Sequence, residues 1–149
     1  MSQPDPRQKN SPWLIPMLTV TDIPRSLAFY EKAFGFTPGM SMDDETGAPA
    51  YADMHYKDQL AIMLMREGAY GGESKSPKTT KVEPATGLYV YCDNVDSLFK
   101  QARNTGADVV DEPADMFWGD RVAKLKDPEG HVWAFATKVR EFEPETALA

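Results

Sequence analysis

The hydrophobic pattern of the first half of the chain predicts one strand, one helix and three further strands. Apolar residues recur at helical spacing after position 22, and Pro24 suits the first turn of a helix that Gly35 ends. Thr21 or Asp22 is placed to cap the start of this helix. The predicted elements are, in order, a strand at 13–20, a helix from Ile23 to Phe34, and strands at 36–42, 51–56 and 59–65.

The second half repeats this order of elements. A helical stripe begins at Val95, with Asp93 or Asn94 as its cap and Gly106 as its end. An Asp-Pro-Glu-Gly turn at 127–130 predicts a hairpin between the last two strands. The predicted strands lie at 87–92, 107–110, 121–126 and 131–137.

The two halves are related by a constant offset. Ser26-Leu27 recurs as Ser97-Leu98, and Gly35 recurs as Gly106, each 71 residues later. A module of this size is too small to bury a good core by itself. The sequence therefore predicts an α+β fold of tandem βαβββ modules that form a curved, cup-like mixed sheet.

Composition shifts predict where the modules begin and end. Residues between the halves are rich in Gly, Ser, Lys, Thr and Pro and lack apolar periodicity, which is typical of a linker. Both ends of the chain are polar. The predicted organisation is a flexible arm at 1–12, a first module at 13–66, a linker at 67–84, a second module at 85–139 and an acidic tail at 140–149.

The charge balance narrows the class of partner. The chain of 149 residues has 16 Lys and Arg and 23 Asp and Glu, which gives a net charge of −7. This excess argues against nucleic acid or an anionic membrane as a partner and favours cationic small molecules. The longest apolar run, Leu60–Met65, is far shorter than a membrane span, and the start of the chain lacks the features of a signal peptide. With Cys92 as the single cysteine, we expect a cytoplasmic protein without disulfides.

Two motifs give the chain a resemblance to a known family. Leu18-Thr19-Val20-Thr21-Asp22, followed by Phe29-Tyr30-Glu31-Lys32-Ala33-Phe34-Gly35-Phe36, resembles the vicinal oxygen chelate superfamily of glyoxalases, bleomycin-resistance proteins and dioxygenases. Trp118-Gly119-Asp120-Arg121, with the 127–133 segment Asp-Pro-Glu-Gly-His-Val-Trp, resembles its PhnB-like branch. The resemblance implies the duplicated fold, but members share architecture and differ in chemistry.

The resemblance also implies where a metal would be held. In metal-dependent members, ligands come from the first and last strands of each module, which places them here at Ile15, Met63, Gly87 and Ala134. Ile, Gly and Ala side chains do not ligate metals, and the Met thioether is too soft for Zn, Mg, Mn or Ni. We therefore expect no metal cofactor and no catalytic residues of the usual kind.

Strand alternation predicts which side chains face the cup. Leu18, Val20, Leu88, Val90 and Cys92 share the opposite parity and should pack under the helices. The lining is then rich in Met and Tyr, with small residues at its floor, which suits a planar or apolar ligand. The predicted ligand-binding residues are Met17, Thr19, His55, Met63, Tyr89, Tyr91, Trp118, Arg121 and Ala134.

Three of the candidates have alternative interpretations. Asp53 can orient His55 as a general base, or both can belong to an exposed polar strand face. Arg121 can bind a carboxylate or phosphonate at the mouth of the cup while Trp118 stacks on a ring. Alternatively, Asp120 and Arg121 form a surface arrangement that shapes the hairpin, and Trp118 is buried at the sheet edge. His131 and Cys92 are expected to be structural.

These expectations lead to a functional hypothesis with two alternatives. The chain is expected to be a homodimer that binds a small molecule without a metal, as bleomycin-resistance proteins sequester cationic, aromatic drugs. One alternative is a lyase, isomerase or dioxygenase with a divalent metal at His55 and Asp53 or Glu67. The other is a metal-free acid–base enzyme that uses Asp53, His55 and the tyrosines.

Overall fold

The computed structural model describes residues 3–144 and divides the chain into two compact units. The first unit holds the chain through Glu31 together with Gly35–Ser76. The second unit holds the chain from Pro77 onward together with Lys32–Phe34. Each unit contains one four-stranded mixed sheet, so the predicted duplicated α+β fold is confirmed.

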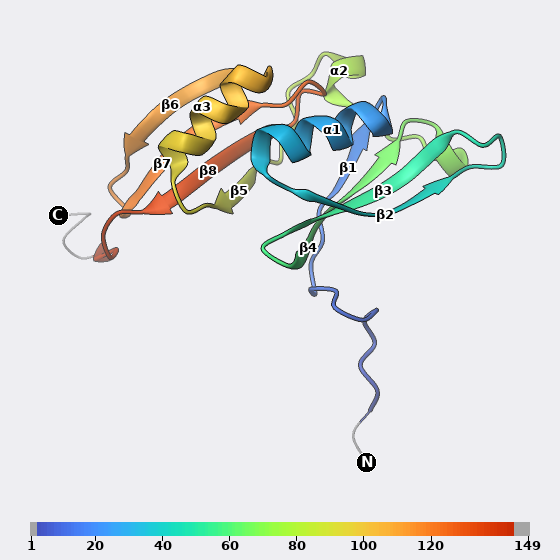
Figure 1. The fold of residues 1–149 in the computed structure, drawn as a ribbon, viewed down its shortest axis with the longest axis horizontal. Helices are drawn as coiled ribbons and strands as arrows, with labels where there is room; N and C mark the ends of the chain where they lie inside the picture. Colours follow the sequence, from blue (N-terminus) through green and yellow to red (C-terminus); the bar gives the residue numbers. More distant parts are fainter. Residues whose placement is uncertain (1–2, 145–149) are drawn as a thin grey trace. The chain divides into compact units, whose positions relative to one another are not determined.

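The first sheet has the strand order β1-β4-β3-β2 (Figure 1). Its strand β1 runs parallel to β4, and the other neighbours are antiparallel. The elements of this module are β1 (Met17–Val20), α1 (Ile23–Phe34), β2 (Thr37–Asp43), β3 (Pro49–Tyr56) and β4 (Gln59–Arg66).

The second sheet repeats this topology as β5-β8-β7-β6, again with its first and last strands parallel. Its elements are β5 (Leu88–Tyr91), α3 (Val95–Thr105), β6 (Asp108–Asp115), β7 (Asp120–Lys126) and β8 (Val132–Lys138). Between the two modules lie a 3₁₀ turn η1 (Ala69–Gly71) and a short helix α2 (Pro77–Thr80), in the stretch predicted as a linker.

Local sequence signals explain the ends of both long helices. The side chain of Asp22 accepts a hydrogen bond from the Arg25 amide at 2.9 Å, and Asn94 accepts one from the Ser97 amide at 3.1 Å. These bonds satisfy amides that have no partner within the helix. Gly106 ends α3 at φ +115°, a left-handed conformation that glycine adopts without a steric penalty.

Two strand boundaries differ from the prediction by more than two residues. Strand β1 begins at Met17 instead of residue 13, since Pro16 has no amide to donate to a neighbouring strand. Strand β6 continues to Asp115, well past the predicted end at Val110. Its polar residues and Pro113 are typical of an edge strand, where backbone groups are not all needed for pairing.

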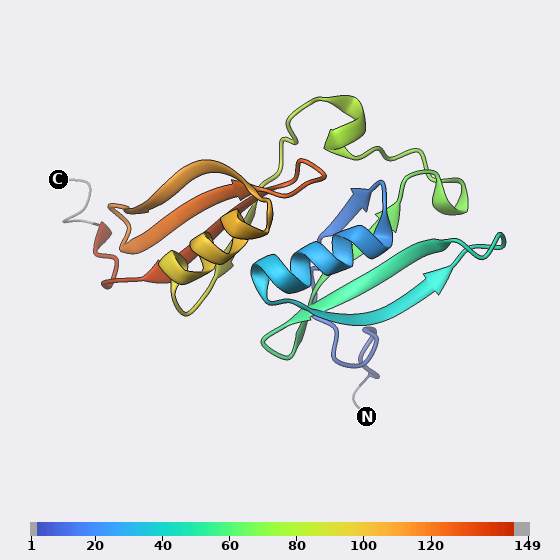
Figure 2. The ribbon, with the colours of Figure 1, turned by 45° about the horizontal axis from the view of Figure 1, so that its top comes forward.

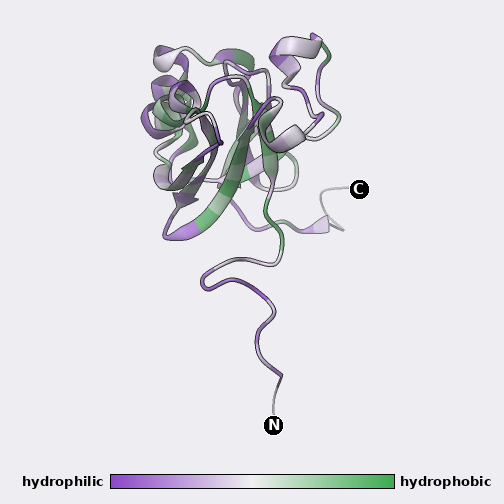
Figure 3. Cartoon of the chain, turned by 90° about the vertical axis from the view of Figure 1, so that its right-hand side faces the viewer, coloured by the Kyte–Doolittle hydropathy of each residue, from purple (hydrophilic) through white to green (hydrophobic). Residues whose placement is uncertain are grey.

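Each sheet has a helix-covered face and an open face (Figure 2). Leu18, Val20, Ile62 and Leu64 are buried on the helix side of the first sheet. Trp133 and Phe135, at most 1% exposed, are buried in the same way in the second. Figure 3 shows hydrophobic residues along the strands and hydrophilic ones along much of the N-terminal arm. The predicted strand parity is therefore correct for these residues, whereas Leu88, predicted to lie under the helices, lines a cavity.

Within residues 3–144, no helix is long and apolar enough to span a bilayer. The predicted flexible arm and acidic tail extend beyond this range, so residues 1–2 and 145–149 of those predictions lie outside the described part.

Candidate functional site

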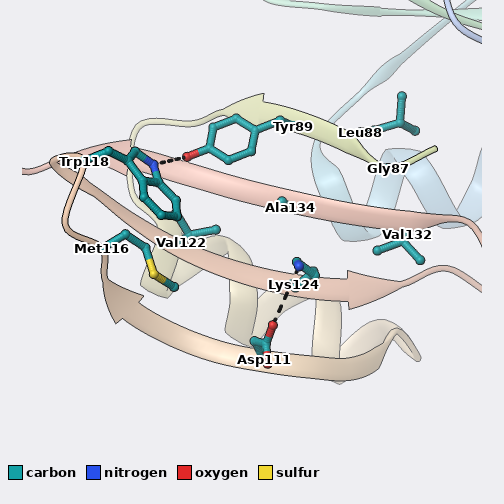
Figure 4. A pocket seen from close by; sticks show the side chains of 10 residues that line it. All are labelled: Gly87, Leu88, Tyr89, Asp111, Met116, Trp118, Val122, Lys124, Val132 and Ala134. Carbon is teal, nitrogen blue, oxygen red and sulfur yellow. Dashed lines mark hydrogen bonds and ion pairs between the residues drawn. The ribbon is translucent and has the colours of Figure 1, made fainter. Parts of the chain in front are cut away.

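A cavity of about 370 Å³ opens on the uncovered face of the second sheet (Figure 4). Its lining comes from all four strands of that sheet and from the turn before β7. The lining residues are Gly87, Leu88, Tyr89, Asp111, Met116, Trp118, Val122, Lys124, Val132 and Ala134. The volume is that of a small-molecule site.

Strand register places small residues at the floor of this cavity. Ala134 lies between Tyr89 on β5 and Lys124 on β7, because these three residues are direct cross-strand partners. Ala136 is fully buried on the same face, where Trp118 packs against its cluster. The short alanine side chains leave room above the sheet, and Trp118 and Met116 form a wall.

A hydrogen-bond chain connects this wall to a buried carboxylate. Nε1 of Trp118 donates to the hydroxyl of Tyr89 at 3.1 Å, and that hydroxyl donates to Oδ2 of Asp120 at 2.6 Å. The hydroxyl of Tyr91 donates to the same oxygen at 2.8 Å. Burial, followed by the bond to Asp120, raises the pKa of Tyr89 to about 12. The bond to Asp120 also raises the pKa of Tyr91, so both phenols stay neutral at physiological pH.

The other polar group of the cavity is an ion pair. Nζ of Lys124 lies 4.0 Å from Oδ2 of Asp111 on the neighbouring strand β6, and Figure 4 shows the two side chains pointing toward each other. Both side chains are about half exposed, so this pair contributes little to stability. Its two charges offset one another at this side of the cavity.

The open face of the first sheet carries a second polar cluster. Oδ1 of Asp53 accepts the Met40 amide at 2.9 Å, and Oδ2 accepts the Tyr51 hydroxyl at 3.0 Å. Nε2 of His55 lies 3.9 Å from Oδ1 of the same carboxylate. Asp53 and His55, which the sequence predicts on one strand face, are therefore neighbours, and Tyr51 joins them. Burial and the bond to Asp53 raise the pKa of Tyr51 to about 12.

The absence of a side chain at Gly39 leaves room for the side chains of Asp53 and His55. The Gly39 backbone is not in a left-handed conformation, yet a Cβ at this position would overlap Oδ1 of Asp53 and lie 2.8 Å from the ring of His55. The glycine is therefore required by the close approach of the two side chains.

The predicted ligand-binding residues do not all meet. Tyr89, Trp118 and Ala134 line the large cavity, and Tyr91 adjoins it through Asp120. Met17 and Thr19 line a smaller cavity of about 210 Å³ in the first unit. Met63 lies on the open face of the first sheet, next to Met17 and Asp53 in the strand register, and His55 follows Asp53 there.

Arg121 requires a correction, because it does not lie at the mouth of the cavity. Its guanidinium binds Asp96, a residue of α3, with Nε to Oδ2 at 3.1 Å, and it also binds Asp115 at 3.1 Å. Residues 120 and 121 point to opposite faces because they are neighbours on one strand. Arg121 therefore ties the helix to the sheet, and its ion pairs raise its pKa further.

His131 and Cys92 have the structural surroundings expected of them. The side chain of Asp127 accepts the amides of Glu129 and His131, both at 3.0 Å, and thereby fixes the turn before β8. Its second oxygen accepts Nε1 of the buried Trp133 at 2.9 Å. Cys92 is buried, with its Sγ 3.7 Å from the hydroxyl oxygen of Thr137.

Comparison with known proteins identifies the family. The family model of the glyoxalase/bleomycin resistance protein/dioxygenase superfamily matches residues 15–135, most of the chain. The chain belongs to this superfamily. The uncharacterized protein Rv0887c of Mycobacterium tuberculosis is 33% identical over 132 residues, which cover 87% of this chain and 76% of that protein. The match does not separate branches of the superfamily, so the PhnB-like branch stays a prediction.

Solved structures of the superfamily fold are also similar. TioX from Micromonospora sp. ML1 matches with a TM-score of 0.65 and 26% identity over 84% of this chain and 97% of that one. The fosfomycin resistance protein FosX from Listeria monocytogenes matches with a TM-score of 0.62 over 85% of this chain and 93% of that one. At 13% identity, the likeness to FosX concerns the fold alone.

The residues at the superfamily's metal positions do not fit a divalent ion. The register places Met63 beside Met17, and Ala134 beside Tyr89, where neither position offers an oxygen or nitrogen ligand. Within residues 3–144, no three side chains of His, Cys, Asp or Glu gather as a metal site. Glu67, the proposed third ligand beside His55, instead accepts the Ser76 amide at 2.6 Å.

Sequence reasoning did not identify Asp120 as part of a site. Its strand parity with Val122 already indicates the open face, but its partners Tyr89 and Tyr91 are 31 and 29 residues away in sequence. Asp111 and Lys124 were missed because the predicted strand at 107–110 ended too early to pair them.

Proposed function

We propose that this protein is a metal-independent small-molecule-binding protein of the glyoxalase/bleomycin-resistance type, which sequesters an aromatic or cationic compound in the cavity of its second unit. The carrying observation is the replacement of ligating side chains by an apolar, aromatic lining. Ala134, at a position where the family resemblance implies a metal ligand, forms the floor of the cavity. Trp118 and Met116 form its wall.

The lining supports a planar ligand. An indole and a phenol offer flat apolar surfaces with polar edges, and the adjoining methionine adapts its shape to the ligand. The lining holds no Ser, Cys or His, and its Lys124 and Asp111 lie 4.0 Å apart as an ion pair. Binding therefore accounts for the geometry better than turnover does.

The test is calorimetric titration with two planar probes, acridine and 9-aminoacridine, and with metal-free bleomycin. Ala134→Phe fills the floor of the cavity and should abolish binding. Val109→Phe is the matched control, since it adds the same ring to a part-exposed residue of β6 that does not line the cavity. Saturable binding that Ala134→Phe alone removes supports the proposal. Absence of binding by every probe, or equal binding by both variants, contradicts it.

Three further expectations accompany this function as predictions. The charge of −7 argues against nucleic-acid and membrane partners, the single cysteine Cys92 favours a cytoplasmic location, and the resemblance to the superfamily suggests a homodimer. Light scattering of the purified protein measures the last of these directly.

A further inference from the structure

We infer that the cavity of the second unit selects a ligand carrying a cationic nitrogen, with Asp120 as its counter-ion and Tyr89 and Tyr91 as the surface between them. The inference rests on the proposed function and names the chemical class of its ligand. Asp120 is the first residue of β7, and its side chain lies on the open face of the sheet. Its residue is only 4% exposed.

The carboxylate of Asp120 is buried without a cation. Within residues 3–144, no Lys, Arg or His forms an ion pair with it, and its hydrogen-bond donors are two neutral phenols. Lys138 is its cross-strand neighbour, but Nζ of that residue binds Glu141 at 2.6 Å. Arg121 is its neighbour in sequence and binds Asp96. Burial of a carboxylate is costly unless a positive charge compensates it.

The aromatic side chains above this carboxylate present a surface that cations favour. The rings of Tyr89 and Tyr91 meet edge to face, with centroids 5.7 Å apart and an interplanar angle of 74°. They are 48% and 57% exposed, so a ligand can reach their faces. Donation to a carboxylate adds electron density to a phenol, and electron-rich rings attract cations more strongly.

The other charges at the cavity do not alter the preference for a cationic ligand. Lys124 is the only cation in the lining, and Asp111 lies 4.0 Å from it, so the two contribute no net charge. Asp120 adjoins the lining through its hydrogen bond to Tyr89 and adds one carboxylate that no cation of the lining offsets. An ammonium group or a protonated ring nitrogen on an aromatic ligand satisfies both this charge and the lining.

Calorimetry with a matched pair of probes tests the charge preference. At pH 8, 9-aminoacridine is a cation and acridine is neutral, while the two share one ring system. We expect the folded protein to bind the cation about tenfold more tightly, or more. Asp120→Asn keeps the size of the side chain and removes its charge, and should bring the ratio of the two affinities close to one. Asp108→Asn removes one charge from exposed β6 and should leave the ratio unchanged.

The ratio is measured on one protein sample, so a lowered folded fraction of Asp120→Asn affects both probes equally. Equal binding of the two probes by the unaltered protein overturns the inference while the proposed function stands. A cation preference that survives in Asp120→Asn also overturns it. Failure of both probes to bind overturns the proposed function and the inference with it.

Discussion

The hydroxyl of Tyr89 lies 2.6 Å from Oδ2 of Asp120, beside the apolar cavity of about 370 Å³ in the second unit. The same hydroxyl accepts Nε1 of Trp118. One side chain thus joins the wall of the cavity to its buried charge, and the orientation of both rings depends on that carboxylate.

Removal of the Tyr89 hydroxyl should destabilise the protein. Tyr89→Phe takes a donor from the buried Asp120 carboxylate and should lower the free energy of unfolding by about 1–2 kcal/mol. Tyr70→Phe is the control, because the Tyr70 hydroxyl bonds only the exposed Asp43 carbonyl, and it should cost under about 0.5 kcal/mol. Urea denaturation measures both. Equal stabilities of the two variants contradict a structural role for the Asp120 bond.

The hydrogen bond between Tyr89 and Asp120 should also be detectable in a titration at high pH. Tyr89 and Tyr51 have folded-state pKa values raised to about 12 from an unfolded value of 10.0. Above pH 10 the unfolded chain loses these protons first, so the contribution of both phenols to stability is complete below pH 10 and declines as the pH rises toward 12. Absorbance titration of phenolate should show Tyr89→Phe losing one of the late-titrating groups. Loss of an early-titrating group contradicts the assignment.

Arg121 should help to attach α3 to the sheet and should not contribute to ligand binding. Arg121→Gln removes ion pairs to Asp96 and Asp115 whose side chains are exposed to solvent, so its effect on the free energy of unfolding should be small. Its affinity for 9-aminoacridine should equal that of the unaltered protein, whereas Trp118→Ala should lose most of the affinity. Phe117→Ala is the control for Trp118, since Phe117 is an adjacent exposed ring outside the lining. A large loss of affinity in Arg121→Gln would contradict this prediction and indicate that Arg121 takes part in ligand binding.

The Asp53–His55 cluster should not tolerate a side chain at position 39. Gly39→Ala drives a methyl group into Asp53 and His55, and should cost about 1–3 kcal/mol of stability. Gly87→Ala is the matched control, because its nearest neighbour for a Cβ is the Val132 carbonyl at 3.9 Å, and it should be neutral or slightly stabilising. Thermal unfolding that ranks the two variants in the opposite order contradicts the close approach.

Local signals predicted much of the fold because they act over a few residues. Helix caps such as Asn94 and the glycine at 106 lie within one turn of the groups they satisfy. Alternation along each strand then assigned Leu18 and Trp133 to the buried side correctly. The extension of β6 past Val110 has no such signal, because an edge strand gains little from apolar side chains.

The site was harder to predict because it depends on pairs that are distant in sequence. Arg121 has the same parity as core residues of β7, yet its partner Asp96 lies on α3, 25 residues earlier. Asp120 gathers two tyrosines from β5 across the sheet. Cup-facing positions follow from alternation alone, whereas the partner that fixes each polar side chain follows only from the register of the strands.

The most direct test of the central claim is calorimetric titration of 9-aminoacridine into protein that has been dialysed against EDTA, repeated with added Zn²⁺, Mn²⁺ or Ni²⁺. We expect saturable binding of one affinity in all samples, since the cavity above Ala134 is lined mainly by aromatic and apolar side chains. Binding that appears only after one of these metals is added would contradict the central claim.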